Sequence, residues 1–420
     1  MKKLNNKMKV YSLAALSSLI ILSACNKDLD TFDAIPATPY AASVGNIAAS
    51  IAANPNDSLF NRMLIRSGML NTLADSTKSF TLFAVDNAGM KVFVNAASGG
   101  AVPLAAPDAT FSAFLSSSLP AASAAGIIQY NTIGQKYPSS LFPVGFPNYP
   151  LPSLIQLDPN SPFVRMPITV AKGSPYSYVN NIPITGVDQI ASNGVIHHTF
   201  TVVAPPSATL RSVIAAKPTL SYFRAALLRA DSGAVVKPNN DSTNFLNYLV
   251  GYGVTNMTVV APNDVAFQTL IFGLVYGQVL AATGSIPIAT AQANGAVAAG
   301  PAFLNTNNVS TALIKGIVAY HFLATNKTGS YKPDIRVFSV NVPSTPTFVK
   351  TLVNGAVAVH PGVLATATFA GPTTSALSFA GAGTFPPGGT AFSQPANVVD
   401  KDNHGANGVL HIIDKVMLPQ

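Results

Sequence analysis

The sequence predicts an α+β fold in which one folding unit occurs twice in tandem. Three short blocks recur in the same order in the two halves of the chain, with helical and strand-like patterns between them. Such internal self-similarity decides the architecture before any other feature, and a length of 420 residues suits two or three domains. The paired blocks are 81–87 with 258–264, 127–131 with 317–321, and 193–197 with 407–411.

The third block is the longest match and contains an Asn-Gly pair in each copy. It begins at Asn193-Gly194 and ends at His197 in the first half, and begins at Asn407-Gly408 and ends at His411 in the second. Asn-Gly is a strong hairpin signal, because both central residues of a type I′ turn need positive φ. We therefore expect a tight turn at each pair, and apolar strands over 199–203 and 413–418 that end before a proline.

Together the blocks resemble the fasciclin domain, whose pattern has a Thr-Val-Phe-Ala-Pro-type strand, a Tyr-His pair and a closing Asn-Gly-Val-Ile-His-type strand. The second half matches better, since it keeps Tyr320 and His321, whereas Asn131 replaces the histidine in the first half. The resemblance covers nearly all of the chain after about residue 43. It implies two fasciclin-like domains, 43–205 and 206–420, the second with insertions. Each would be a mixed β-wedge or sandwich with packed helices.

Residues 1–24 resemble a bacterial lipoprotein signal peptide. A lysine-rich start precedes an uncharged stretch at 10–24, which is shorter than the roughly 20 residues of a membrane span but long enough for a signal-peptide core. The stretch ends in Leu22-Ser23-Ala24-Cys25, which looks like a lipobox. Cys25 is the single cysteine of the chain, so no disulfide competes for it. We expect Cys25 to carry palmitate or similar acyl chains.

The segment 25–42 is predicted to be a lipidated tether, because it contains Pro36 and Pro39 among small residues. Asp28 and Asp30 form an acidic cluster directly after the cysteine, which resembles the surface-export signal of some Gram-negative lipoproteins. The predicted location is therefore the cell outer membrane, with the chain lipid-anchored and exposed at the surface.

Local patterns place the first elements of both units. Asp57-Ser58 is a candidate N-cap for a helix that Gly68 would end, and residues 80–85 are predicted to be a buried strand. Residues 138–168 hold many prolines and are expected to be a long loop or irregular edge. A helical pattern opens the second unit, with apolar residues at Leu210, Val213, Ile214, Leu220, Phe223, Leu227 and Leu228.

Two long stretches of the second unit contain no charged residue. They lie between Asp264 and Lys315 and between Lys350 and Asp400. Glycine, proline and amide residues interrupt the first stretch and prolines interrupt the second, so neither is expected to contain an unbroken apolar helix that could cross a membrane. We expect loops and strands on a surface with little charge.

The composition excludes several kinds of site. All 16 acidic residues are Asp, so a zinc-protease helix of the His-Glu-x-x-His type and an EF-hand loop closed by Glu are both absent. Four leader lysines account for half of the formal charge of +8, and the other basic residues are scattered, which argues against nucleic-acid binding. No nucleophile motif or phosphate loop occurs, so we expect no cofactor and no metal.

The histidines of the blocks are expected to be structural. His411 lies on a strand that is apolar on both faces, which predicts a buried imidazole bonded to backbone or to a partner such as His321. The loop Asp400 to His404 offers oxygen ligands, but its spacing fits no calcium loop and is more typical of a solvated turn.

These features predict a non-catalytic cell-surface lipoprotein. The resemblance implies cell adhesion or contact with an extracellular matrix, with the outer membrane and an unknown extracellular protein as partners. An alternative is an accessory polysaccharide-binding lipoprotein of a glycan-uptake system, in which Tyr and Phe of the loop 137–149 would stack on sugars. A hydrolase built on aspartates is the third and least favoured alternative.

Overall fold

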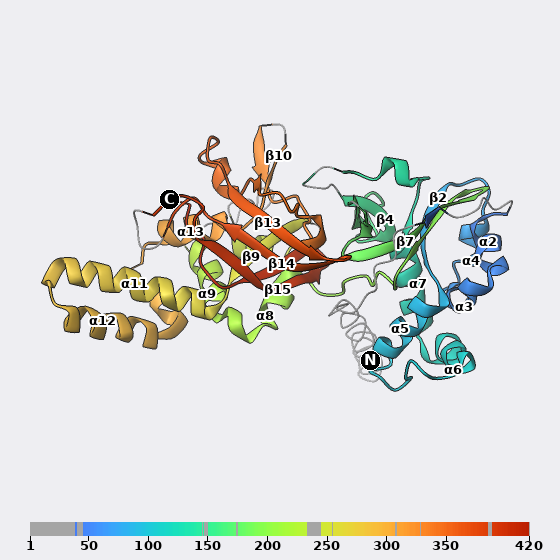
Figure 1. Ribbon diagram of the computed structural model, residues 1–420, viewed down its shortest axis with the longest axis horizontal. Helices are drawn as coiled ribbons and strands as arrows, with labels where there is room; N and C mark the ends of the chain where they lie inside the picture. The colour runs from blue at the N-terminus through green and yellow to red at the C-terminus, as the bar shows by residue number, and fades with distance from the viewer. Residues whose placement is uncertain are drawn as a thin grey trace, which may run out of the picture. The chain divides into compact units, whose positions relative to one another are not determined.

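The computed structural model describes residues 38–39, 45–144, 146, 150–173, 175–232, 245–253, 255–306, 309–327, 329–384 and 389–419. The predictions for the leader, Cys25, Asp28 and Asp30 lie outside these residues. The α+β class is confirmed, since each half combines helices with a sheet (Figure 1). The chain divides after Ser207 into two compact units, here called unit one and unit two.

Unit one contains an eight-stranded sheet of order β1-β7-β6-β5-β4-β3-β2-β8. Strands β7 and β8 also pair with each other, so the sheet closes on itself like a barrel. Its strands are β1 (Thr38–Pro39), β2 (Phe80–Val85), β3 (Thr132–Ile133), β4 (Pro150–Gln156), β5 (Arg165–Lys172), β6 (Ser177–Val179), β7 (Ile182–Ala191) and β8 (Gly194–Thr199).

Helices of unit one bury their apolar faces together with β2 and β8. The helices are α2 (Ile47–Ala53), α3 (Ser58–Arg66), α4 (Leu70–Ala74), α5 (Asn87–Ala97), α6 (Asp108–Ala113) and α7 (Ala121–Tyr130). Leu59, Phe60, Met63 and Leu64 recur at helical spacing on α3 and are all buried, and Gly68 follows the helix with φ of 72°. The predicted helix and the buried strand at 80–85 are therefore confirmed.

Unit two contains a six-stranded sheet of order β12-β13-β14-β15-β16-β9 and a separate two-stranded ribbon. The six are β9 (Met257–Pro262), β12 (Thr347–Val349), β13 (Val363–Ala370), β14 (Thr373–Ala380), β15 (Pro395–Gly405) and β16 (Gly408–Ile413). The ribbon pairs β10 (Thr325–Lys327) with β11 (Ser330–Lys332).

The helices of unit two are α8 (Leu210–Ala215), α9 (Ser221–Ala230), α10 (Leu246–Leu249), α11 (Asp264–Thr283), α12 (Ile286–Ala298) and α13 (Thr311–Tyr320). The helical pattern predicted after residue 206 is confirmed for α8 and α9, although Leu228 is exposed and not part of the core. Helices α11 and α12 run side by side as a hairpin that extends away from the sheet (Figure 1).

The first sequence block forms a strand and the cap of the next helix in both units. Strand β2 leads to Asp86, whose side chain accepts a hydrogen bond from the Gly89 N–H and caps α5. Strand β9 leads to Asn263, which caps α11 through the Ala266 N–H. An Asx residue after a buried strand therefore starts the same kind of helix twice.

Two expectations about the Asn-Gly pairs and the strands after them are wrong. Each Asn-Gly pair was expected to form the turn, but the hairpin pairs close Ala191 with Gly194 and Gly405 with Gly408, so the asparagine is the second loop residue and the glycine begins the strand. Neither asparagine has positive φ. Their side chains donate hydrogen bonds to the Leu73 and Val250 carbonyls, which are distant in sequence, and not to the backbone of their own turn. The strands accordingly end at Thr199 and Ile413, where the expected strands were placed to begin.

The proline-rich segment 138–168, expected to be a long loop or an irregular edge, contains strand β4 and the start of β5. Pro150 and Pro152 lie in β4 and pair regularly with Thr169 and Pro167, and the β4–β5 ladder becomes irregular after Pro152, where the register shifts before Gln156.

The expectation for the first uncharged stretch is also wrong, since it forms an unbroken 20-residue helix, α11, followed by α12. Gly273 and Gly277 do not stop α11, because an apolar helix tolerates single glycines at a modest cost of about 1 kcal/mol each. The second uncharged stretch forms mainly strands β13 and β14, as expected.

Candidate binding site

The block histidines occupy equivalent places in the two units. His197 lies on β8 opposite Phe83, and His411 lies on β16 opposite Val260, in parallel ladders of identical register. The Nδ1 of His197 accepts the N–H of Asp188 at 3.2 Å, and the Nδ1 of His411 accepts the N–H of Asp402 at 3.3 Å. Their Nε2 atoms face backbone carbonyls, both at 3.0 Å, of Tyr137 and Val337 respectively.

Each of these aspartates also holds a serine from a neighbouring loop. Asp188 accepts from the N–H and the hydroxyl of Ser139, and Asp402 accepts from the N–H and the hydroxyl of Ser339. Asp188 and Asp402 lie at bulges with φ of 61° and 60°, a strained conformation for residues other than glycine. The serine bonds offset this strain and fix the loop against the strand.

A serine, a histidine and an aspartate thus lie together in each unit without forming a catalytic triad. The serine hydroxyl bonds the carboxylate, and both ring nitrogens of the histidine bond backbone groups. Burial lowers the pKa of His197, so its imidazole is neutral at pH 7. A triad needs the histidine to face the serine hydroxyl, and that geometry is absent from both clusters.

Asn193 and Asn407 hold the start of each unit against its closing hairpin. The Oδ1 of Asn193 accepts from the Ile47 N–H at 2.8 Å, and the Oδ1 of Asn407 accepts from the Leu210 N–H at 2.7 Å. Their Nδ2 atoms donate to loop carbonyls, among them Leu73 and Val250. Each asparagine therefore satisfies the first turn of a helix that is distant in sequence.

The glycine that follows each asparagine is required by a close backbone approach. A Cβ on Gly194 would lie 2.0 Å from the Phe80 carbonyl oxygen, and one on Gly408 would lie 2.1 Å from that of Met257. The Asn-Gly pair is therefore a joint between a helix start and a parallel strand pair.

Tyr320 and His321 form a third buried cluster. The Tyr320 hydroxyl donates to the Gly362 carbonyl at 2.6 Å and accepts from the Ala382 N–H at 3.0 Å. The His321 Nδ1 faces the Ile317 carbonyl at 2.7 Å, and its Nε2 accepts from the Met417 N–H at 3.1 Å. Burial lowers the pKa of His321 to about 4 and raises that of Tyr320 to about 12, so both are neutral at pH 7. His411 has backbone partners and does not bond His321.

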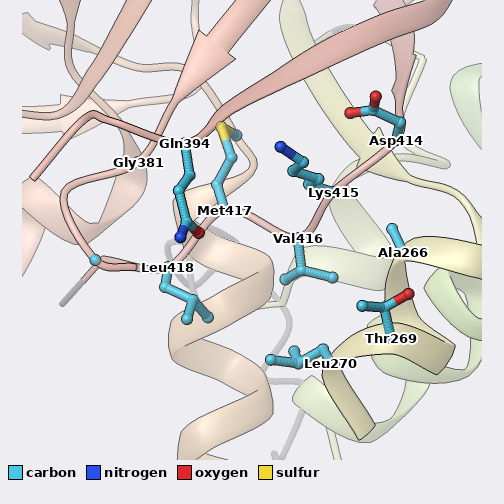
Figure 2. A pocket seen from close by; sticks show the side chains of 11 residues that line it. Ala266, Thr269, Leu270, Gly381, Gln394, Asp414, Lys415, Val416, Met417 and Leu418 are labelled. Carbon is cyan, nitrogen blue, oxygen red and sulfur yellow. The ribbon is translucent and has the colours of Figure 1, made fainter. Parts of the chain in front are cut away.

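These two residues position one wall of a pocket in unit two. Its volume is about 280 Å³, and it lies between the start of α11 and the segment 414–418 that follows β16. Apolar side chains of Leu270, Val416 and Leu418 lie together, and Gln394 and Lys415 bring polar ends (Figure 2). Asp414 also lines the pocket, but its carboxylate is occupied by the backbone and side chain of Asn397. The pocket suits a small, partly apolar ligand, and Lys415 is the basic residue of its lining.

Two further buried polar pairs were not found from the sequence. Asp57 was expected to cap α3, but it is fully buried and its carboxylate lies 3.1 Å from the His198 Nε2. Asn87 takes over the cap, since its Oδ1 accepts from the Leu59 N–H at 2.9 Å. Asp57 and His198 lie far apart in sequence, so no local pattern reveals their contact.

In unit two, the fully buried Arg336 contacts the His404 Nε2 at 2.7 Å and Asn256 at 2.8 Å. Burial and the guanidinium charge hold the pKa of His404 well below its usual value. Residues 400–404 are accordingly part of strand β15, and the expected solvated turn is wrong: Asp402 is buried under Ser339, and Asp400 pairs with Lys217.

In the loop 137–149, the rings of Tyr137 and Phe142 pack against the protein and against each other. Phe142 is 3% exposed and packs edge-on against His197 at 5.0 Å between ring centroids. The half-buried Tyr137 stacks on Phe142 and donates its hydroxyl to the Leu141 carbonyl. These rings stabilise the histidine cluster. Across the described part of the chain, no group of three or more His, Cys, Asp or Glu side chains is placed to hold a metal ion.

No protein-family model and no curated protein matches the chain. Among solved structures, the chain is similar to a FAS1 domain pair from the insect cell adhesion molecule fasciclin I. The sequence identity is 12% and the TM-score is 0.31, over 86% of this chain and 96% of that one. The equivalence of the two units rests on their own hydrogen bonds and not on this similarity.

Proposed function

We propose that the chain is a non-catalytic binding protein of the cell surface, built from two fasciclin-like domains and anchored through acyl chains on Cys25. The observation that carries the proposal is the matching pair of clusters at His197 and His411. In both clusters the serine, aspartate and histidine join a loop to a strand. The side chains that could take part in catalysis therefore serve as a scaffold in each unit.

The anchor rests on the lipobox that ends at Cys25, and the surface location on the acidic cluster at Asp28 and Asp30. Several acyl chains, at about 0.8 kcal/mol per buried methylene, hold a protein firmly on a membrane. A scaffold of two similar units at the end of a tether suits adhesion or matrix binding, since paired sites raise avidity without new contacts. The inward-facing aromatic rings of the 137–144 segment give no support to the polysaccharide alternative.

The test compares cells that carry the wild-type chain with cells that lack it. We expect protease added to intact cells to digest the wild-type chain, and we expect the wild-type cells to aggregate or to adhere better to an array of matrix proteins and glycans. Replacing Asp28 and Asp30 by Ala should protect the chain from the protease. Equal adhesion of both strains on every surface would contradict the binding role, and equal digestion of the variant would contradict the export signal.

A further inference from the structure

Helix α11 leaves the body of unit two after its first two turns. Ala266, Phe267, Leu270 and Ile271 are buried at its base, and no later residue of this fully described helix is buried. Yet the helix is long and apolar enough to cross a membrane, and only 22% of the residues in its most apolar stretch are buried in the protein. A helix that is apolar on all sides is normally buried in a core or in lipid, so most of α11 has no adequate cover in unit two.

The other apolar helices of the chain differ in this respect. The bent pair 108–118 and 121–130 passes the same test of length and composition, but Phe111, Leu115 and Ile127 of that pair belong to the core of unit one. The uncharged strand β13 likewise buries alternate residues in its sheet. The α11–α12 hairpin is therefore the apolar segment, within the described residues, that the fold itself leaves exposed.

Helix α12 covers one side of α11 and adds apolar surface of its own. Ala289, Ala293 and Ala296 recur on one face and are buried, and small residues of this kind let two helices approach closely in membranes as well as in water. On the open side, Ile286 is 62% exposed and Ile288 is 46% exposed. The hairpin thus presents isoleucine side chains to its surroundings near its tip.

The hairpin carries no charge after Asp264 and its tip is hydrogen-bonded internally, whereas the exposed amide side chains of Gln278, Gln292 and Asn294 lie away from the tip. Residues 265–314 contain no Asp, Glu, Lys, Arg or His, whereas the chain as a whole has one charged residue in ten. At the tip, Gly284 donates its N–H to the Leu280 carbonyl, and the Thr283 hydroxyl donates to the Val279 carbonyl. Polar groups in lipid must be satisfied within the protein because water is absent there. A protein-binding surface would normally carry a polar, charged rim instead.

The length of the free part decides how deep it can reach. Residues 272–283 extend about 18 Å at about 1.5 Å per residue, against a hydrocarbon core of about 30 Å. At the base, an apolar cavity of about 70 Å³ between α11 and α13, lined by Leu270, Leu274 and Leu313 among others, continues the apolar surface into the unit. We propose that the α11–α12 hairpin inserts into one leaflet of a lipid bilayer, with acyl chains as its partner.

The test uses residues 26–420, which contain every residue that the structure describes and lack Cys25. Failure of the lipid anchor therefore cannot affect the result. We expect this protein to float with neutral phosphatidylcholine vesicles in a density gradient. The double variant Ile286→Asp/Ile288→Asp should bind at least tenfold more weakly, because a carboxylate resists entry into hydrocarbon. Asp is well tolerated in the first turn of a helix, so the thermal unfolding of the double variant should match that of the wild type.

The matched control places the same charges on exposed apolar residues of unit two outside the hairpin. Val359 is 90% exposed and Phe348 is 52% exposed, and Val359→Asp/Phe348→Asp should float like the wild type. A wild-type protein that does not float, or a hairpin variant that floats equally, overturns the proposal. Self-association without vesicles that the hairpin variant abolishes would assign the surface to a second copy and also overturn it.

Depth can be measured independently, since residues 26–420 contain no cysteine. A single cysteine at the exposed Ala281, close to the tip, is labelled with an environment-sensitive dye, and Val359→Cys serves as the reference. Vesicles should shift the emission of the Ala281→Cys label to the blue, and lipids with a quencher on the acyl chain should quench it. A label at 281 that stays as accessible to a water-soluble quencher as the one at 359 would contradict insertion.

Discussion

Asn131 and His321 brace the same point of the closing segment through hydrogen bonds of opposite direction. Asn131 donates to the Val203 carbonyl at 2.8 Å, whereas His321 accepts from the Met417 N–H at 3.1 Å. Both also face the carbonyl four residues earlier in their helix. An amide can therefore replace the imidazole with only a local change of backbone, which explains how unit one keeps its fold without the Tyr-His pair.

This relationship predicts a pH dependence for unit two. The pKa of His321 is about 4 in the folded protein and about 6.5 in the unfolded chain, so the unfolded state binds more protons between these values. The contribution of His321 to the free energy of unfolding should be constant above about pH 7 and should fall by roughly 3 kcal/mol as the pH drops from 6.5 to 4. Denaturant unfolding of unit two at several pH values, monitored by hydrogen exchange, would measure this change in free energy.

The control is His321→Asn, which introduces the residue that unit one uses. Asn can donate to the Ile317 carbonyl and accept from the Met417 N–H, and it does not titrate. The variant should fold and should lose about one proton from the pH dependence of unit two. An unchanged dependence would show that other groups, such as His404 or the carboxylates, cause the acid sensitivity.

His411→Ala should destabilise unit two by roughly 1 to 3 kcal/mol. The substitution leaves the buried Val337 carbonyl and the Asp402 N–H without their imidazole partner. His197→Ala should have a similar effect in unit one, where the partners are the Tyr137 carbonyl and the Asp188 N–H. Calorimetry of each variant against the wild type checks both values. A normal melting temperature together with lost ligand binding would instead make His411 part of a functional site.

The strands and the helix starts could be predicted because their signals are local. A buried apolar run predicts β2, and helical spacing predicts α3. The cluster at Ser339, Asp402 and His411 could not be predicted, because the serine lies far from the strand in sequence and its loop has no regular pattern. Asp57 illustrates the same limit: next to Ser58 it resembles a cap, yet its partner His198 is reached only in the folded unit.

The error over α11 has a different physical origin. Single glycines weaken a helix only slightly, so Gly273 and Gly277 could not decide against one. Periodicity also fails here, because α11 is apolar on every side and has no polar face from which to recognise a helix. The order of the three blocks was informative because each block forms equivalent contacts in both units.

Gly408→Ala should destabilise unit two by at least about 2 kcal/mol, since the new Cβ would meet the Met257 carbonyl oxygen and separate β16 from β9. Gly316→Ala in α13 is the matched control, because no atom lies within 4 Å of its Cβ position. Alanine is better than glycine inside a helix by about 1 kcal/mol, so this control should be neutral or stabilising. Equal melting temperatures of the two variants would refute the close-approach argument.

Cys25→Ser should abolish acylation of the chain. The variant removes the thiol that the lipobox presents, so the precursor should stay uncut by the lipoprotein peptidase and lose metabolic labelling with palmitate. The size of the product on a gel gives a second readout, since the uncut precursor keeps residues 1–24. Normal labelling of the variant would show that Cys25 is not the attachment site.

The buried pair in unit one gives the last prediction. Asp57→Ala leaves His198 without its carboxylate partner and should cost roughly 3 to 5 kcal/mol, as is usual when one member of a buried pair is removed. The Asn54 side chain, which donates to the same carboxylate at 2.9 Å, also loses its acceptor. A double-mutant cycle with His198→Ala separates the two effects, because the Asn54 contribution is the same in both backgrounds. A coupling energy near zero in denaturant melts would show that His198 draws its stability from other neighbours and that the pair is incidental.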